Sequence, residues 1–243
     1  MGRVSATFDV FYRTERAGAL RLADGGGPFG FDITVALLVD ELIARCALDA
    51  LVETGCHLGD TTSYLARRYP QLPVRSCDID PASVAFTRHR LTGRHNAAVT
   101  YIDSPQLVAA ACERYERPLL YLDAHWGPDW PLARELAAIT SGVAVIHDFD
   151  IGHPRFGYDT YDGVVCGPQV LAAMAAPPPL YFIPDPDAEL PLPCLQTGRR
   201  AGVAVVPFGV DTQPLLGMPG LLAHRLPGAV APVTAGAGSG GGR

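Results

Sequence analysis

The sequence predicts an α/β protein with a Rossmann-like, doubly wound sheet of seven mostly parallel strands and an antiparallel C-terminal strand. Three observations predict this class. Five short apolar segments alternate with single helical segments between residues 47 and 147, which is typical of βαβ units in a parallel sheet covered on both faces. Two further apolar segments follow, at 180–183 and 202–207. The chain of 243 residues, 48% of them hydrophobic, is long enough to form one domain with a full core.

The individual elements follow from apolar spacing and helix-start signals. Residues 32–46 carry apolar side chains at helical spacing, and Asp32 stands at the N-cap position. We expect further helices over 61–68, 81–91, 105–115, 131–139 and 168–176, and the first five strands over 47–53, 74–78, 97–102, 119–123 and 143–147. Side chains that look like helix caps precede or begin two of these helices: Asp60, Thr61, Thr62 and Asp80.

The chain divides into three parts. Residues 1–31 are expected to be an irregular segment and a candidate cover of the active site, and residues 32–227 form the α/β domain. Residues 228–243 are rich in Ala, Gly, Pro and Ser, which is typical of a disordered tail.

Composition excludes several classes of protein. The 19 basic and 25 acidic residues give a net charge of −6, which argues against a generic nucleic-acid binder. No apolar segment approaches the roughly 20 residues of a membrane span, and the first residues lack the apolar core of a signal peptide. We therefore expect a cytoplasmic protein, without membrane or nucleic-acid partners, whose six cysteines stay reduced. All 19 basic residues are arginine, so lysine chemistry is excluded.

An acidic residue stands at the end of each of the first five predicted strands. In an open parallel sheet, ligands bind beyond the carboxyl ends of the strands. Unpaired carboxylates are costly to bury, so packing alone does not explain a row of them. The acids that mark this edge as the binding site are Glu53, Asp78, Asp103, Asp123 and Asp148.

The loop after the first strand has the pattern ExGxxxG, formed by Glu53, Gly55 and Gly59. It differs from the GxGxxG pattern of dinucleotide-binding loops, which hold a pyrophosphate. A leading acid repels phosphate but suits an ammonium or sulfonium group, and Asp78 suits two ribose hydroxyls. The Asp103-Ser104 pair is then in position to reach an adenine edge. A ligand with these groups and no phosphate is S-adenosylmethionine.

In this order, the segments 53–62, 77–80 and 103–104 resemble motifs of class I S-adenosylmethionine-dependent methyltransferases. Later segments, 121–126, 146–149, 156–161 and 196–202, are similar to a bacterial subgroup with LDAHW and FGYDxY sequences. The resemblance implies the class I methyltransferase fold and a set of cofactor contacts: Glu53, Gly55, Gly59 and Thr61 around the methionine end, Asp78 at the ribose, Asp103 and Ser104 at the adenine, and Asp123 beneath the sulfonium.

The resemblance extends distantly to metal-dependent O-methyltransferases, which hold Mg²⁺ with one carboxylate after the fourth strand and a pair of residues after the fifth. The corresponding positions are Asp123, His147 and Asp148. His147 departs from that pattern, because imidazole is a softer ligand than Mg²⁺ prefers. Mg²⁺, Mn²⁺, another divalent metal or no metal therefore remain open. The candidate catalytic residues are His125, Asp123 and His147, since no lysine is present to act as general base.

The aromatic and polar segment after the fifth strand is a candidate substrate lid. The candidate substrate contacts are Trp126, Asp150, Phe156, Tyr158 and Tyr161, although packing at the domain edge would also explain the aromatic side chains.

The leading functional hypothesis is O-methylation of a small molecule. An N-methyltransferase, or an enzyme that binds S-adenosylmethionine for cyclisation or elimination, remains an alternative, because this fold hosts several chemistries. A non-catalytic binding module is disfavoured by the ionisable groups at the strand ends, and a dehydrogenase by the missing GxGxxG. The methyl acceptor is not identified, and the existence of a homodimer is left open.

Overall fold

The computed structural model describes residues 2–17, 19, 26–124, 129–189 and 200–226. The main sheet contains β1 (Ala50–Thr54), β2 (Val74–Asp78), β3 (Ala97–Tyr101), β4 (Pro118–Leu122), β5 (Gly142–His147), β9 (Leu180–Pro184), β11 (Val203–Phe208) and β12 (Leu221–Arg225). Two small ribbons are formed by β6 (Phe156–Gly157) with β10 (Arg200–Ala201), and by β7 (Thr160–Tyr161) with β8 (Val164–Val165).

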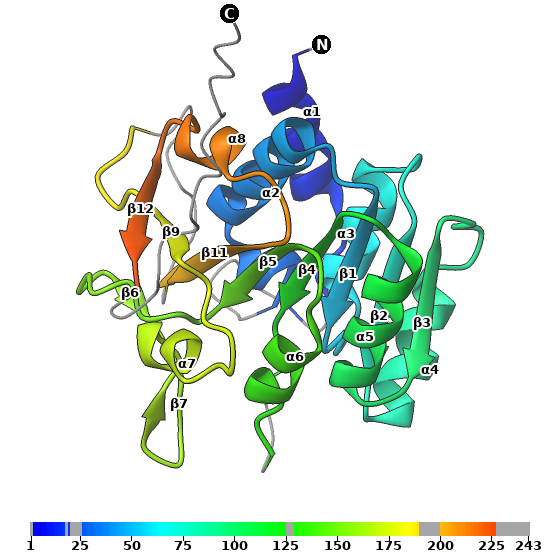
Figure 1. Ribbon diagram of the computed structural model, residues 1–243. Coiled ribbons are helices and arrows are strands. Elements are labelled where there is room, and N and C mark those ends of the chain that lie inside the picture. The colour runs from blue at the N-terminus through cyan, green and yellow to red at the C-terminus, as the bar shows by residue number, and fades with distance from the viewer. Residues whose placement is uncertain (1, 18, 20–25, 125–128, 190–199, 227–243) are drawn as a thin grey trace, which may run out of the picture.

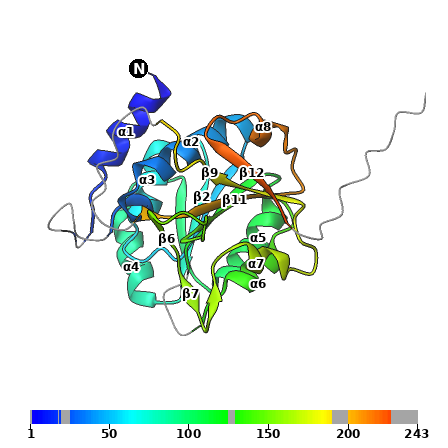
Figure 2. The same ribbon diagram turned by 90° about the vertical axis from the view of Figure 1, so that its left-hand side faces the viewer.

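Helices cover both faces of the main sheet (Figure 1). They are α1 (Arg3–Arg13), the 3-10 turn η1 (Pro28–Phe31), α2 (Ile33–Cys46), α3 (Asp60–Arg68), α4 (Pro81–Arg90), α5 (Ser104–Arg114), α6 (Leu132–Ala138), α7 (Pro168–Ala172) and α8 (Gln213–Leu216). Figure 2 shows α1, α3 and α4 on one side of the sheet and α5, α6 and α7 on the other. Among the helices of the described residues, none combines the length and apolarity that a bilayer crossing needs.

The sheet order is β12-β9-β11-β5-β4-β1-β2-β3. Strands β3, β2, β1, β4 and β5 are parallel neighbours, and β11 runs antiparallel to both β5 and β9. The predicted α/β class and its antiparallel C-terminal strand are confirmed. All seven predicted strands are present, and β12 adds an eighth, antiparallel strand at the edge beside β9.

The buried strands separate two hydrophobic layers because successive side chains point to opposite faces. In β1, Leu51 packs in the layer under α1, α2 and α3, while Val52 packs in the layer under α5 and α6. In β11, Val205 and Val206 divide in the same way. Strands buried on both faces explain the nearly continuous apolar segments of the sequence.

The N-terminal segment differs from the prediction. Residues 1–31 were expected to be irregular, but Arg3–Arg13 form α1, whose Phe11 is fully buried. Phe11 lies against the rings of Phe31 and Tyr64, with ring centroids 5.4 and 5.8 Å away. The predicted helix over 168–176 is also shorter, because α7 ends at Ala172. The predicted tail, 228–243, lies outside the described residues.

Candidate active site

Asp123, His147 and Asp148 form a compact cluster at the carboxyl ends of β4 and β5. The His147 Nδ1 atom lies 3.0 Å from Asp123 Oδ1 and 3.4 Å from Asp148 Oδ2. One potential ligand atom from each residue lies within 4.8 Å of the other two. The three residues named from sequence as metal ligands are therefore brought together.

The backbone explains why two successive residues reach the same point. Successive side chains of a strand point to opposite faces, so His147 and Asp148 would diverge if β5 continued. Asp148 instead has a φ of +54°, a conformation that costs free energy in a residue with a Cβ atom. This turn directs the Asp148 carboxylate back toward His147. Asp123 arrives from the neighbouring strand, one residue after Leu122, which pairs with Ile146.

The two neighbouring carboxylates determine the protonation state of His147. Burial lowers the pKa of His147, but the carboxylates of Asp123 and Asp148 raise it by more, to about 10. At neutral pH and without a metal, His147 is thus an imidazolium held between two carboxylates. Asp123 is the most accessible member, with 24% of its side chain exposed, and its backbone N–H donates to Thr54 Oγ1.

The glycines of the ExGxxxG loop allow close packing of this loop on its neighbours. A Cβ atom on Gly55 would lie 3.1 Å from the backbone of Asp123 and Ala124 at the end of β4. On Gly59, which has a φ of +71°, a Cβ atom would lie 2.5 Å from Thr87 Cγ2 in α4. Protein packing therefore already requires both glycines, and their contact with a cofactor stays a prediction.

Glu53 lies beneath this loop and is only 2% exposed. Its Oε2 atom accepts hydrogen bonds from the hydroxyls of Thr62 and Ser76, the latter at 2.8 Å. Burial raises the pKa of Glu53 to about 8, although the two hydroxyl donors lower it. Glu53 thus links β1 to α3 and β2 through Thr62 and Ser76. Its contact with the methionine end of a cofactor stays a prediction.

At the end of β2, the carboxylate of Asp78 accepts hydrogen bonds from the backbone N–H groups of His57 and Asp80, both at 2.9 Å. These two bonds fix the orientation of Asp78 toward the glycine loop. The next residue, Ile79, is 66% exposed. Ile79 was not among the residues predicted from sequence; the signal that could have found it is an apolar residue between two acids at a strand end.

Asp103 and Ser104 begin α5 and differ in their surroundings. Asp103 forms an ion pair with Arg134 at 2.6 Å, and Arg134 also contacts Asp129. The Ser104 hydroxyl is buried and has no hydrogen-bond partner among the described residues. A buried hydroxyl without a partner costs free energy, so Ser104 is available to a polar ligand.

The N-terminal segment reaches the cluster through Gly30. A Cβ atom on Gly30 would lie 3.9 Å from His147 Cε1. Two side chains of α3 hold the segment in place: Asp60 accepts from the N–H groups of Ala17 and Gly27, at 3.0 and 2.7 Å, and Thr61 Oγ1 accepts from Phe29 N–H at 3.0 Å.

These contacts change the interpretation of the predicted caps. Asp80 caps α4, as expected. Asp60 does not cap α3, whose N-cap residue is Gly59 without a side-chain bond, because its carboxylate binds the N-terminal segment and Arg90 instead. The Thr61 hydroxyl is engaged by Phe29, so the predicted cofactor contact of Thr61 would share that oxygen. The predicted role of residues 1–31 as a cover remains a prediction.

The candidate substrate residues lie in different surroundings. Tyr161 stacks on Trp130, with ring centroids 5.2 Å apart, and the Arg200 guanidinium lies 4.9 Å from the Phe156 ring. Tyr158 is exposed, and Asp150 accepts from Gly152 N–H within the loop. The segment after β5 is connected to the cluster by a backbone hydrogen bond, since Asp159 N–H donates to the Asp148 carbonyl at 3.0 Å. His125 and Trp126 lie outside the described residues.

The strand order is that of a Rossmann-like, doubly wound α/β sheet in which an antiparallel strand, β11, lies between β5 and β9. Among solved structures, the chain is similar to a candidate O-methyltransferase from Klebsiella pneumoniae, at 15% identity and a TM-score of 0.48, over 86% of this chain and 90% of that one. It is also similar to cofactor-bound Rv0187 from MTB, at 16% identity and a TM-score of 0.49, over 86% and 90% of the two chains.

A third likeness, to a fibrillarin/Nop5p complex, covers 45% of this chain and only 57% of the other, at 16% identity and a TM-score of 0.35. No family model and no curated protein matches the chain. Likenesses at these values say nothing about activity or substrate, and the fold class rests on the strand order.

Proposed function

We propose that this protein is an S-adenosylmethionine-dependent methyltransferase that O-methylates a small molecule with the help of a divalent metal. The cluster of Asp123, His147 and Asp148 is the observation that carries the proposal. Ligands of an open parallel sheet bind at the carboxyl ends of its strands. Ionisable side chains at that edge can therefore hold the acceptor hydroxyl and remove its proton.

The donor set fits a metal with affinity for both oxygen and nitrogen. Two carboxylates and one imidazole suit Mn²⁺, Fe²⁺ or Zn²⁺ better than Mg²⁺, which prefers oxygen ligands. His147 must lose its proton to act as a ligand, and the metal would then replace that proton between the two carboxylates. A bound divalent metal lowers the pKa of a hydroxyl that approaches it.

The cofactor fits the neighbouring strand ends. Asp78 retains acceptor capacity for ribose hydroxyls, because each of its carboxylate oxygens has a second lone pair. The exposed side chain of Ile79 offers an apolar surface for a planar base, and the partnerless hydroxyl of Ser104 offers it a polar contact. S-adenosylmethionine supplies an electrophilic methyl group when it is bound.

Removal of the proton from the acceptor hydroxyl is assigned to residues of this chain. Asp123 is the accessible carboxylate and is in position to take the proton of the acceptor hydroxyl, with His125 as a second candidate. His147 and Asp148 are buried. Without a metal, the hydrogen bond between His147 and Asp123 fixes the Asp123 carboxylate; with a metal, both residues would be ligands beside it. N-methylation is the alternative, because protonated His147 contacts both carboxylates and can hold the cluster together without a metal. Cyclisation or elimination with the same cofactor is also compatible with these contacts.

Calorimetry with S-adenosylhomocysteine tests the proposal. We expect saturable binding, and Asp78→Ala should weaken it by about 1.5–3 kcal/mol, which is the scale of a hydrogen bond to a charged group. Asp187→Ala is the matched control, since this carboxylate is exposed and follows β9, which lies five positions from β2 in the sheet. A folded protein that binds neither cofactor form would contradict every cofactor-dependent reading, and an Asp78→Ala variant with unchanged affinity would remove Asp78 from the ribose contact.

A further inference from the structure

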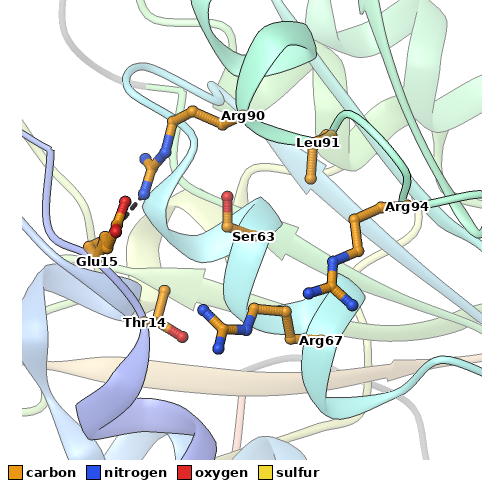
Figure 3. A pocket seen from close by; sticks show the side chains of 7 residues that line it. All are labelled: Thr14, Glu15, Ser63, Arg67, Arg90, Leu91 and Arg94. Carbon is orange, nitrogen blue, oxygen red and sulfur yellow. Dashed lines mark hydrogen bonds between the residues drawn. The ribbon is translucent and has the colours of Figure 1, made fainter.

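A second polar pocket lies away from the candidate active site, between the end of α1 and helices α3 and α4 (Figure 3). It encloses about 140 Å³ and shares no lining residue with the cluster at the strand ends. The side chains that line it are Thr14, Glu15, Ser63, Arg67, Arg90, Leu91 and Arg94.

Three guanidinium groups surround this pocket, and they differ in how strongly the protein engages them. Arg90 is fully engaged: it donates to the carbonyls of Leu58 and Glu15 and pairs with Asp60 at 2.6 Å. Arg67 makes one long hydrogen bond, of 3.3 Å, to the Arg13 carbonyl. The side chain of Arg94 has no hydrogen bond or ion pair among the described residues.

The charge that remains in the pocket is positive. Asp60 pairs with Arg90, and the one carboxylate among the lining side chains, that of Glu15, is outnumbered by the guanidinium groups of Arg67 and Arg94. One positive charge is therefore left over on the side formed by Arg67 and Arg94. Positive charge without a protein partner attracts anions from solution.

Ser63 provides an independent observation that points to a ligand. The residue is only 8% exposed, and its Oγ atom is buried without a hydrogen-bond partner among the described residues. Figure 3 shows this hydroxyl on α3, directed toward the side of the pocket formed by Arg90 and Leu91. Buried hydroxyls in folded proteins normally have a partner, so an acceptor inside the pocket would satisfy Ser63.

We propose that this pocket binds the phosphate group of a small phosphorylated molecule. Guanidinium groups bind phosphate oxygens in a bidentate manner, and Ser63 adds a hydroxyl donor. The volume is below the roughly 300–1,000 Å³ of pockets that enclose drug-sized ligands, so the phosphate enters while the rest of the molecule stays outside. S-adenosylmethionine has no phosphate, so the inference does not depend on the proposed function.

Titration with inorganic phosphate and with glycerol phosphate tests this site. Both are followed by thermal unfolding and calorimetry, with sodium chloride added to keep the ionic strength constant. We expect a saturable rise of Tm with each probe and none with chloride. Arg94→Ala should weaken binding at least tenfold and Ser63→Ala severalfold. Ser63→Ala keeps a good helix former in α3 and removes the partnerless hydroxyl, so this variant should fold.

The matched control is Arg225→Ala, which removes the same charge from the exposed strand β12. Binding by this variant should equal that of the wild type. The proposal is overturned if neither probe gives saturable binding, or if Arg94→Ala and Arg225→Ala lose equal affinity, which would indicate net charge alone. Binding of inorganic phosphate with exclusion of glycerol phosphate would overturn the assignment to a phosphorylated molecule.

Discussion

Replacement of Glu53 by glutamine should change how the stability of the fold depends on pH. Glu53 is buried beneath the glycine loop, and burial raises its pKa to about 8 from an ordinary value of 4.5. The folded protein therefore keeps a proton on this carboxyl that the unfolded chain releases. A group with a raised folded pKa stabilises the fold below its unfolded pKa, and this contribution is lost as the pH rises through the folded pKa.

The magnitude follows from the two pKa values. While the folded state binds one extra proton, the free energy of unfolding falls by about 1.4 kcal/mol per pH unit. Between pH 5.5 and 8.5 this amounts to about 3 kcal/mol, because the slope flattens near the folded pKa. Glutamine has the same shape as glutamic acid and can still accept from Thr62 and Ser76, but it does not titrate.

The assay is urea unfolding of the wild type and Glu53→Gln at pH 5.5 and 8.5, in buffers free of metal. The wild type should lose about 3 kcal/mol more than the variant between these pH values. The stabilisation from His147 also falls above about pH 6.5, because the unfolded chain releases a proton that folded His147 keeps up to about pH 10. This happens in both proteins, so the difference isolates Glu53. Glu113→Gln, on the exposed face of α5, is the control and should follow the wild type. Equal pH dependence of the wild type and Glu53→Gln would refute the reasoning.

Two further predictions concern the metal cluster and the glycine loop. Asp148→Asn should weaken Mn²⁺ binding, measured by calorimetry, by at least about tenfold, because one anionic ligand is lost; unchanged affinity would show that Asp148 is not a ligand. Gly59→Ala should lower the free energy of unfolding by about 1–3 kcal/mol beyond the loss in Gly93→Ala, because the added Cβ atom overpacks against Thr87. Gly93 also has a positive φ, but a Cβ atom there meets open space, and equal losses would exclude the contact with Thr87 as the cause.

Much of the cluster could be predicted because it depends on strand order. Once alternating segments imply a parallel sheet, the residues after neighbouring strands must meet at one edge. Asp123 and Asp148 were recognised as strand-end acids on this basis, and the resemblance to metal-dependent O-methyltransferases added His147 to the set; the three side chains lie together. The sequence contains no signal for the positive φ of Asp148, because several backbone conformations are open to an aspartate at the end of a strand.

The features that were not predicted depend on contacts between distant segments. Helix α1 has no capping side chain at its start, and it is stabilised by packing on Tyr64 and Phe31, which no local pattern reveals. Asp60 looked like a helix cap because local spacing cannot show that Gly27 and Arg90 compete for its carboxylate. Strand β12 is short and partly exposed, so its apolar pattern is weak.

The position of β11 has a consequence for the order of events during synthesis. This strand lies between β5 and β9 in the sheet, although it follows both in the chain. As the nascent chain leaves the ribosome, the first five strands can assemble, but β9 emerges before either of its neighbours, β11 and β12. One edge of β5 therefore stays open to other nascent chains until Val203–Phe208 has emerged. Once β11 has paired with β5, that edge of β5 can no longer pair with another chain.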